Sequence, residues 1–358
     1  MMNQQMLEQA YRGKKVFLTG HTGFKGSWLL LWLHALGAEV KGYALAPENE
    51  NDLYRLINGN TLCTSVIADI RDKEKLKEAI LSFQPDYVFH LAAQPLVRLS
   101  YQMPVETFDT NVMGTAHLLD ALRFLEKKSH AVLITTDKVY ENLEQDYAYK
   151  ETDRLGGSDP YSASKGASEI VISSYRNSFF NLNDYKQHQK AIAVARAGNV
   201  IGGGDRAKDR IIPDIIKALE SGEEVVVRNP EAVRPWQHVL EPLFGYLLLG
   251  ARLNHDPVKF ADAWNFGPEN SDILKVQLLV EIAIKSWGEG RYITPQLNHQ
   301  PHEARLLQLD IGKAKNSLQW IPKFNSAKAI ELTIDWYKNA ASDYKAYTLK
   351  QINEYMHQ

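Results

Sequence analysis

Tyr161 and Lys165 are the residues of this sequence whose types and spacing first suggest chemistry. They lie four positions apart in the segment YSASK, with only small residues between them. On a helix these positions share a face, so the phenol and the ammonium can meet over one site. A nearby cation lowers the pKa of a phenol and makes it a usable base. The alternative is an ordinary helix with a surface tyrosine and a solvated lysine, and the pentapeptide alone leaves both open.

Three glycines mark a second segment with a chemical role, the turn TGHTGFKG. Gly20, Gly23 and Gly26 stand between a strand-like run, KVFLT, and a helix-like one, GSWLLLWLHALG. A glycine-rich turn that opens a helix lets backbone N–H groups approach a pyrophosphate, which the helix N-terminus also favours. The spacing is GxxGxxG, not the GxGxxG of the usual dinucleotide fingerprint. At the start of a repeating strand–helix series, this turn predicts a nucleotide site.

The end of the second strand-like run, EVKGYAL, indicates which dinucleotide is bound. The position near Ala44, where such a site places an acid for the adenosine ribose, carries none, and the first acid is Glu48. No arginine stands there for a 2′-phosphate, so NAD is favoured over NADP, with a weak hold on the ribose. After the third run, SVIADI, Asp69 and Ile70 are placed to reach the adenine. The alternative for Asp69 is to cap the helix in DKEKLKEAI.

Strand-like runs alternate with helix-like segments over the first 200 residues. This alternation predicts βαβ units and a parallel sheet, and the near-continuous apolar runs predict a sheet covered on both faces. We expect an α/β fold with a Rossmann-like doubly wound parallel sheet that binds its ligand beyond the carboxyl ends of the strands. After residue 200 the elements become shorter and mixed, which predicts a smaller, non-contiguous mixed α/β substrate domain. The strand-like runs are KVFLT, EVKGYAL, SVIADI, DYVFHLAA, AVLITTD and AIAVARAGNV.

Composition argues against several classes of protein. The 358 residues are 44% hydrophobic and 23% charged, as in ordinary globular proteins, and a net charge of -2 gives no basic surface for nucleic acid. One cysteine, Cys63, excludes an internal disulfide and a multi-cysteine metal site, and the histidines show no metal-ligand spacing, so we expect no metal. The sequence has neither a long apolar run nor a signal-peptide pattern, so we expect a cytoplasmic protein without membrane contact.

Five segments, in their order and spacing, resemble the extended short-chain dehydrogenase/reductase family over nearly the whole chain. They are the GxxGxxG turn, HLAAQ (90–94), Asn111 in NVMGT, TTDKVY (135–140) and YSASK. The resemblance implies that Tyr161 is the catalytic base, that Lys165 lowers its pKa and binds the nicotinamide ribose, and that Thr136 hydrogen-bonds the reacting hydroxyl. It also implies NAD as cofactor, held by Gly20, Thr22, Gly23, Phe24, Gly26, Asp69, Ile70, Leu91, Ala92, Ala93, Asn111, Tyr161 and Lys165.

Within that family, TTDKVY resembles the segment of the sugar-nucleotide 4,6-dehydratases, which carry Thr-Asp-Glu here. Thr136 and Asp137 match, and Lys138 replaces the glutamate, as in the branch of this group that acts on CDP-glucose. That branch is also resembled by RAGNVIGGGDRAKDRIIPD (196–214) and RPWQHVLEP (234–242). The resemblance implies a hydro-lyase of deoxysugar (lipopolysaccharide) biosynthesis, which oxidises C4, removes water across C5 and C6 and returns hydride to C6. Asp137 would be the protonated acid and Lys138 the neutral base at C5, with a salt bridge between them as the alternative.

The resemblance also implies a substrate site, a division into domains and an assembly. Residues 1–200, with parts of 235–270, would form the NAD-binding domain, and residues 201–358 mainly the nucleotide-sugar domain. The helices in VETFDTNVMGTAHLLDALRFL and YSASKGASEIVISSYRNSF would form the interface of a homodimer. Substrate contacts would come from Gln94, Asn199 and Arg234, with Arg206, Arg210 and Arg305 as weaker candidates for the pyrophosphate.

Other functions stay open from the sequence. A UDP-sugar 4-epimerase needs Tyr161 and Lys165 but neither Asp137 nor Lys138, and a 4,6-dehydratase could take another NDP-hexose. A non-catalytic protein that only senses NAD has no use for the Tyr-Lys-Thr set. We expect His90 to be a structural residue near the cofactor, not a base.

Overall fold

The sheet at the centre of the molecule has seven parallel strands. A computed structural model of the protein describes residues 2–208, 210–295 and 307–358. The strands lie in the order β12-β7-β5-β4-β1-β2-β3, and every neighbouring pair is parallel. This arrangement confirms the predicted doubly wound sheet. The strands are β1 (Lys15–Thr19), β2 (Glu39–Ala44), β3 (Thr64–Ile67), β4 (Tyr87–His90), β5 (Ser129–Ile134), β7 (Lys190–Ala197) and β12 (Ala263–Phe266).

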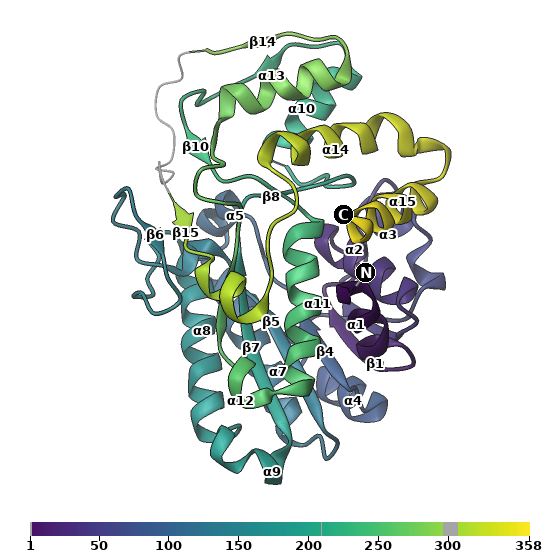
Figure 1. The fold of residues 1–358 in the computed structure, drawn as a ribbon, viewed down its shortest axis with the longest axis vertical. Helices are drawn as coiled ribbons and strands as arrows, with labels where there is room; N and C mark the ends of the chain where they lie inside the picture. The colour runs from purple at the N-terminus through teal and green to yellow at the C-terminus, as the bar shows by residue number, and fades with distance from the viewer. Residues whose placement is uncertain (1, 209, 296–306) are drawn as a thin grey trace.

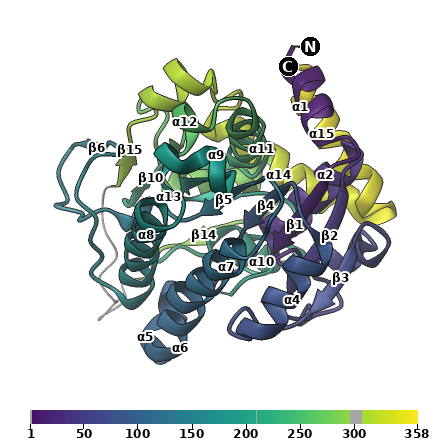
Figure 2. The same ribbon diagram turned by 90° about the horizontal axis from the view of Figure 1, so that it is seen from below.

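Helices cover both faces of this sheet, as Figure 2 shows. One face carries α2 (Phe24–Ala35) and α11 (Leu240–His255), and the other carries α4 (Lys73–Phe83), α7 (Gly114–Arg123) and α8 (Pro160–Ser178). A separate hydrophobic cluster fills each side of the sheet. Because both faces are covered, β4, β5 and β7 are buried along their whole length, which explains their near-continuous apolar sequences.

The helix that the sequence predicts in VETFDTNVMGTAHLLDALRFL (105–125) is interrupted. α6 (Pro104–Phe108) passes into a π-helical turn, η2 (Asp109–Met113), before α7 begins at Gly114. A π turn holds more residues than an α turn and often marks a functional position. Here it contains Asn111, which is 1% exposed, so the irregular turn coincides with a predicted site residue.

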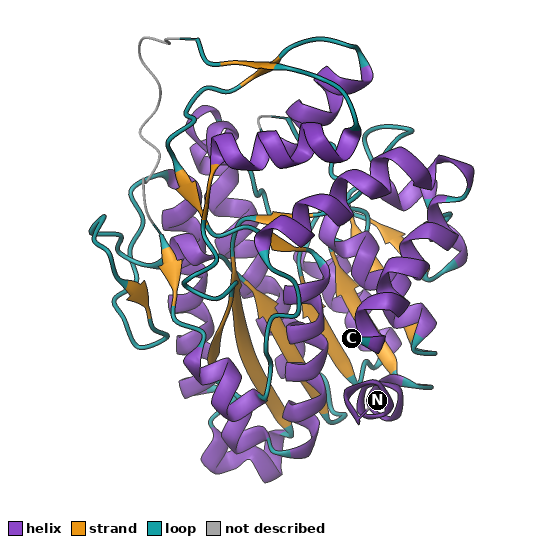
Figure 3. Cartoon of the chain, turned by 45° about the horizontal axis from the view of Figure 1, so that its top comes forward, coloured by secondary structure: helices purple, strands orange, loops and turns teal. Residues whose placement is uncertain are grey.

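Shorter elements lie beyond the carboxyl ends of the strands, at the upper end of the molecule in Figures 1 and 3. Three helices form most of this part, α10 (Ile211–Glu220), α13 (Val276–Trp287) and α14 (Ser326–Asn339). The short strand pairs are β8 (Val200–Ile201) with β11 (Gln237–His238), β9 (Val225–Val226) with β14 (Tyr292–Ile293), β10 (Val233–Arg234) with β13 (Leu274–Lys275), and β6 (Ala148–Tyr149) with β15 (Gln308–Leu309).

Both ends of the chain lie on the same side of the molecule (Figures 1 and 2). α1 (Met2–Tyr11), which the polar N-terminal sequence did not predict, packs on α11, and its Tyr11 hydroxyl donates to the Leu247 carbonyl at 2.6 Å. α15 (Tyr344–His357) packs on α2, and its Tyr355 hydroxyl donates to the Glu241 carboxylate at 2.8 Å. With β12 and α11, these contacts bring several segments after residue 200 back to the parallel sheet.

The remaining elements are short. Among the helices of the described residues, none has the length and apolar character needed to cross a bilayer. The short helical elements not yet named are α3 (Leu53–Leu56), η1 (Gly59–Thr61), α5 (Val97–Gln102), η3 (Asp137–Val139), η4 (Leu182–Asp184), α9 (Tyr185–His188), α12 (Pro257–Phe260), η5 (Ala314–Leu318) and η6 (Ala340–Ser342).

Candidate active site

Tyr161 and Lys165 lie on the first two turns of α8. Pro160 is at the first helical position, where its missing N–H costs nothing, and Asp159 caps the helix because its Oδ1 accepts the backbone N–H of Ser162 at 2.9 Å. The start of the helix, and so the position of both side chains, is fixed by this local sequence. Both side chains are buried, so the alternative of a surface tyrosine and a solvated lysine is wrong.

Thr136 and Asp137 follow the end of β5 and are also buried. The Asp137 carboxylate accepts hydrogen bonds from the Thr136 hydroxyl at 2.8 Å and from Asn199 Nδ2 at 3.3 Å. Gly198 leaves the space that this carboxylate fills, because a Cβ on that glycine would overlap it. Within the described parts of the chain no ion pair joins Asp137 to Lys138, so the salt-bridge alternative is not what the structure shows.

The pKa of Tyr161 is raised to about 12, chiefly by burial. A hydrogen bond with Thr136 and the charge of Arg210 lower it, and the Asp137 carboxylate raises it. The lowering by Lys165 that the sequence predicted is therefore absent here. Lys165 instead donates from Nζ to the Ile134 carbonyl at 3.0 Å, and its own pKa falls to about 8 because it is buried.

Lys25 is a lysine of this region that the sequence reasoning missed. Its Nζ donates to the hydroxyl of Tyr246, a fully buried residue of α11, at 3.2 Å. Burial, together with the charges of Lys165 and Arg210, lowers the pKa of Lys25 to about 7, and Asp137 raises it. The signal in the sequence was a single charged residue between the glycine turn and the apolar run GSWLLLWL. The charges of Lys165 and Arg210 thus both act on Lys25, and the charge of Arg210 also acts on Tyr161.

The glycine turn packs tightly under the ends of β1 and β4. Gly20 has φ +74, and a Cβ there would come within 2.7 Å of the Ala92 backbone nitrogen. A Cβ on Gly26 would overlap the Gly20 carbonyl, and exposed Gly23 donates its N–H to that carbonyl at 3.1 Å. A side chain at Gly20 or Gly26 would therefore push the turn apart. The exposed backbone of the turn, at the N-terminus of α2, suits the diphosphate of a dinucleotide.

The side chains within this turn have separate tasks. Thr22 donates its hydroxyl to the Leu45 carbonyl at 2.9 Å, which ties the turn to the end of β2, and Phe24 starts α2. His21, which the sequence reasoning did not single out, is fully buried, and its Nε2 is 2.7 Å from Ser65 Oγ. Burial lowers the pKa of His21 to about 4, so this imidazole is neutral at physiological pH.

The ends of β2 and β3 carry no ribose-binding acid in the position expected. Ala44 is buried, and the exposed side chain after it is apolar Leu45. Asp69 forms an ion pair with Arg71 at 2.6 Å, which lowers the Asp69 pKa. α4 is capped by Asp72, so the alternative in which Asp69 caps that helix is wrong.

Residues after β4 are held by a polar cluster around Asn111. Its Nδ2 donates to the Gln94 carbonyl at 3.1 Å and to Ser164 Oγ on α8 at 2.8 Å, and its Oδ1 accepts the Gln94 N–H. The Gln94 side-chain amide donates to Thr107 Oγ1 and to the Leu96 carbonyl, so in this structure the amide stabilises the loop after β4. The predicted Leu91, Ala92 and Ala93 lie in the same loop, and Leu91 and Ala92 donate their N–H groups to Thr19 Oγ1.

His90 is structural, as predicted. Its ring nitrogens lie 2.8 Å from Thr19 Oγ1 and 3.2 Å from Thr115 Oγ1. It is buried between β1, β4 and α7, and burial lowers its pKa to about 3. Ile70, the last predicted cofactor residue, is buried against Gly114, whose missing side chain leaves room for it.

A pocket opens beside Asp137. Its wall comes from segments far apart in sequence and includes Gln237, whose Nε2 donates to the carbonyls of Gly198 and Phe266 at 3.0 Å each. Over the described ranges no group of three His, Cys, Asp or Glu side chains could hold a metal ion. The lining residues are Asp137, Gly198, Pro235, Gln237, Gly267, Pro268, Glu269, Asn270, Ile273, Gln308 and Leu309.

Two of the predicted substrate residues are next to this pocket, and two others pair with acidic residues. Asn199 contacts Asp137, and Arg234 precedes the lining residue Pro235. Arg206 lies 3.7 Å from Glu220 and over the ring of Tyr337. Arg210 pairs with Asp205 at 2.9 Å and acts electrostatically on Tyr161. Arg305 falls outside the described residues.

Comparison with known proteins identifies related chains. The model of the family "GDP-mannose 4,6 dehydratase" matches residues 17–333. A CDP-glucose 4,6-dehydratase of Salmonella typhimurium is 48% identical over 97% of both chains. A UDP-glucose 4-epimerase of Mycoplasma genitalium is 26% identical over 92% of this chain and 98% of its own.

Solved structures show the same fold at low identity. A dTDP-glucose 4,6-dehydratase of Streptomyces venezuelae, solved with NAD and TYD bound, is 23% identical, has a TM-score of 0.75 and covers 92% of this chain and 98% of its own. A UDP-glucose 4-epimerase of Thermotoga maritima, solved with UDP-glucose, is also 23% identical, with a TM-score of 0.77 and 91% and 99% coverage.

Proposed function

The chain belongs to the GDP-mannose 4,6-dehydratase family of extended short-chain dehydrogenases/reductases, and we propose that it is an NAD-dependent CDP-glucose 4,6-dehydratase. It converts CDP-D-glucose to CDP-4-dehydro-6-deoxy-D-glucose, in deoxysugar biosynthesis for lipopolysaccharide. The observation that carries this proposal is the 48% identity, over nearly the full length of both chains, to a protein of that activity. The segment Thr136-Asp137-Lys138 beside buried Tyr161 and Lys165 supplies the matching functional groups.

NAD would occupy the site at the carboxyl ends of β1, β2 and β4. The glycine turn fits its diphosphate, because the turn presents backbone where Cβ atoms at Gly20 and Gly26 would collide. Asp69 and Ile70 would lie at the adenine end, and Asn111, Tyr161 and Lys165 at the nicotinamide end. When bound, NAD accepts a hydride from C4 of the sugar and returns it to C6.

Tyr161 would take the proton from the 4-hydroxyl, with Thr136 as its hydrogen-bonding partner. With a pKa of about 12, this phenol is almost wholly protonated at neutral pH. Activity there requires the occupied site to lower that pKa, since a base acts best when its pKa lies near the working pH. The charge of Arg210 already acts in this direction on Tyr161.

Asp137 and Lys138 would carry the elimination. The 4-ketone acidifies the C5 proton, which Lys138 would remove, while Asp137 would protonate the departing 6-hydroxyl. The hydroxyl of Thr136 and the amide of Asn199 both face the Asp137 carboxylate, so its two oxygens are fixed in orientation beside the pocket. Orientation of this kind places the acid at one hydroxyl of the sugar.

The competing function is a UDP-sugar 4-epimerase, which the related chains also include. Such an enzyme interconverts epimers through the same 4-ketone and needs no acid–base pair at Asp137 and Lys138. A direct test is incubation of the purified protein with CDP-, dTDP-, GDP- or UDP-glucose, with and without added NAD. Mass analysis should show loss of one water from CDP-glucose. Unchanged mass with a changed sugar configuration would favour the epimerase.

The proposed assembly is a cytoplasmic homodimer built on α6 and α8. α5 and α6 pack against α8, and their outer surface is apolar, with Val105 74% and Ile170 63% exposed. Contiguous exposed apolar surface of this kind marks protein interaction sites. We propose that a second copy covers it about a two-fold axis. The exposed apolar residues of this face are Tyr101, Met103, Val105, Phe108, Met113 and Ile170.

The two parts of the chain would divide the ligands. Residues 1–200, with the returning segment within 235–270, would bind NAD, and residues 201–358 would mainly bind the nucleotide sugar. The pocket beside Asp137 takes its lining from both proposed parts, since Asp137 and Gly198 belong to the first and Ile273, Gln308 and Leu309 to the second.

A further inference from the structure

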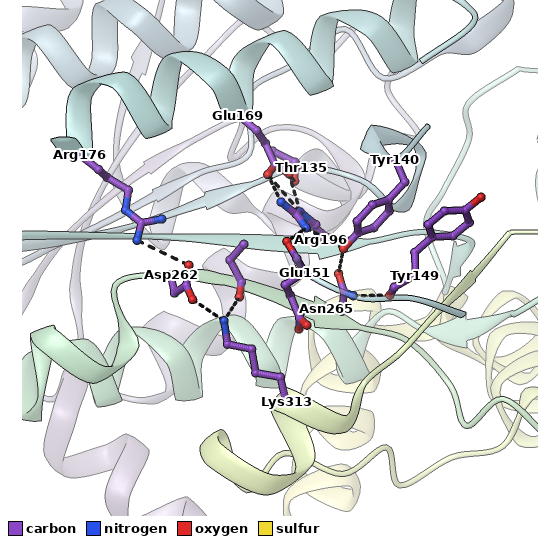
Figure 4. A network of polar contacts seen from close by, with 11 residues as sticks. Thr135, Tyr140, Tyr149, Glu151, Glu169, Arg176, Arg196, Asp262, Asn265 and Lys313 are labelled. Carbon is purple, nitrogen blue, oxygen red and sulfur yellow. Dashed lines mark hydrogen bonds and ion pairs between the residues drawn. The ribbon is translucent and has the colours of Figure 1, made fainter. Parts of the chain in front are cut away.

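Asn265 is a fully buried residue of β12, and its side-chain amide and backbone N–H all have hydrogen-bond partners. Its Nδ2 donates to the carbonyls of Tyr149 at 2.9 Å and Asp310 at 3.1 Å, and its Oδ1 accepts the Tyr140 hydroxyl at 2.7 Å. Its backbone N–H donates to the Glu151 carboxylate at 2.9 Å. Figure 4 shows the contacts of Asn265 with Tyr140 and Tyr149. Because two carbonyls and one hydroxyl surround it, the amide has one satisfied orientation.

One side of this amide holds part of the pocket wall. Tyr149 ends the short strand β6, and Asp310 directly follows β15, which pairs with β6 over two residues. The Asp310 N–H donates to the Tyr149 carbonyl at 2.8 Å. The residues that precede Asp310, Gln308 and Leu309, line the pocket together with Asp137. The two hydrogen bonds from Asn265 therefore fasten this wall to the central sheet.

The oxygen of the Asn265 amide is connected, through Tyr140 and Arg196, to α8 and to the end of β5. The Tyr140 hydroxyl accepts a hydrogen bond from Arg196 Nη1 at 2.6 Å. Arg196 forms a buried ion pair with Glu169, one turn beyond Lys165 on α8. Glu169 also accepts the hydroxyl of Thr135, the neighbour of Thr136, at 2.7 Å. One network thus touches β5, α8 and the pocket wall.

From this geometry we propose that Asn265 is a positioning residue, which sets the 308–310 wall of the substrate pocket relative to Asp137 and Tyr161. The inference rests on the proposed function, since it assigns the wall to a nucleotide sugar. Without Asn265 the Asp310 carbonyl would lose its donor, while the Tyr149 carbonyl would keep the Asp310 N–H. A polar group that loses its partner is unfavourable, so the β6–β15 segment would shift to find another donor. The sugar would then bind in a poorer position, while the glycine turn would be untouched.

The test compares three variants well below their melting temperatures. Asn265→Leu removes the amide, and Tyr140→Phe removes only the hydroxyl that joins it to Arg196, which also provides a milder variant should the first fail to fold. Gln351→Leu is the matched control, because that buried amide donates to the Leu332 carbonyl at 2.9 Å but belongs to α15. We expect Asn265→Leu to raise the KM for CDP-glucose by about tenfold or more, with NAD affinity by fluorescence within about twofold of wild type. Tyr140→Phe should give a smaller rise, and the control none.

Hydrogen exchange of the ligand-free proteins supplies a readout that does not depend on the substrate. Exchange at the backbone amides of residues 308–312 should be faster in Asn265→Leu than in wild type or Gln351→Leu. Unchanged exchange there, or an unchanged KM despite a lower melting temperature, would overturn the positioning role. If wild type fails to turn over CDP-glucose, the proposed function falls, and the exchange comparison still decides whether Asn265 holds the wall.

Discussion

Glu241 offers a quantitative test of how the C-terminal helix is held. Its side chain is 0% exposed, and its carboxylate accepts the backbone N–H groups of Lys323 at 2.9 Å and Phe324 at 2.7 Å and the Tyr355 hydroxyl at 2.8 Å. Burial nevertheless dominates and raises the pKa of Glu241 from 4.5 to about 7. In Glu241→Gln, the amide oxygen can accept both backbone donors and the NH₂ group can donate to Tyr355. The change therefore removes the titration and keeps the contacts.

The sign follows from which state holds the proton. Between pH 4.5 and 7 the folded protein keeps the Glu241 proton that the unfolded chain loses, so the wild-type free energy of unfolding falls as pH rises. A shift from 4.5 to about 7 is about 2.5 units at 1.36 kcal/mol each, or about 3 kcal/mol. Full burial means that no discount for solvent screening applies. Above about pH 7 the difference between the two proteins should become constant.

The assay is urea denaturation of wild type and Glu241→Gln from pH 4.5 to 8. The variant should gain stability relative to wild type by about 3 kcal/mol over this range. Parallel stability curves for the two proteins would refute the inference that Glu241 is buried with a raised pKa.

Four further outcomes test the active site and the assembly. Tyr161→Phe should lower turnover by a factor on the order of 10² to 10⁴, and full activity in that variant would remove Tyr161 as the base. Asp137→Asn should oxidise C4 but lose water slowly, so reduced nicotinamide should accumulate in single-turnover absorbance traces; undiminished water loss would contradict the acid role. The purified protein should be partly empty of NAD, and added NAD should raise its activity. Ala44→Asp should raise NAD affinity by about tenfold. Wild-type protein that is fully loaded after purification would show that other contacts hold the ribose. Val105→Glu with Ile170→Glu should convert a dimer to monomer in sedimentation, and a wild-type monomer at micromolar concentration would dispose of the proposed interface.

The parts of the fold that sequence predicted are those set by local rules. β1, β4, β5 and β7 follow from apolar runs between helix-length spacers, and the position of Tyr161 follows from the Asp-Pro that starts α8. The return of β12 to the sheet edge depends on contacts between residues 190–197 and 263–266, which no local pattern encodes. α1 was missed because it buries few side chains, Leu7 and Tyr11 among them, within a polar segment.

The site was predictable in residue type but not in electrostatics. The pairing of Tyr161 with Lys165 follows from helical spacing, yet the pKa of Tyr161 depends on burial and on Arg210, nearly fifty residues later in the chain. Lys25 became visible as an active-site lysine only when α11 placed Tyr246 against it. The sequence analysis read the segment around Asn111 as one continuous helix, and the π-helical turn at Asp109–Met113 became visible only in the structure.

The contact between the first helix and α11 has a consequence for synthesis on the ribosome. The Tyr11 hydroxyl bonds to the Leu247 carbonyl, 236 residues later in the chain, and the last strand of the sheet, β12, follows α11. At about 5 to 20 residues per second, the apolar side of α1 and the buried face of α2 wait on the order of 10 to 50 seconds for their covering helix. During that interval the nascent chain exposes Leu7, Trp28 and Trp32, which are buried in the finished protein. Chaperone binding to the nascent chain should therefore be strongest before α11 emerges. Synonymous codon changes that slow translation ahead of residue 240 should lower the yield of folded protein without altering its final stability.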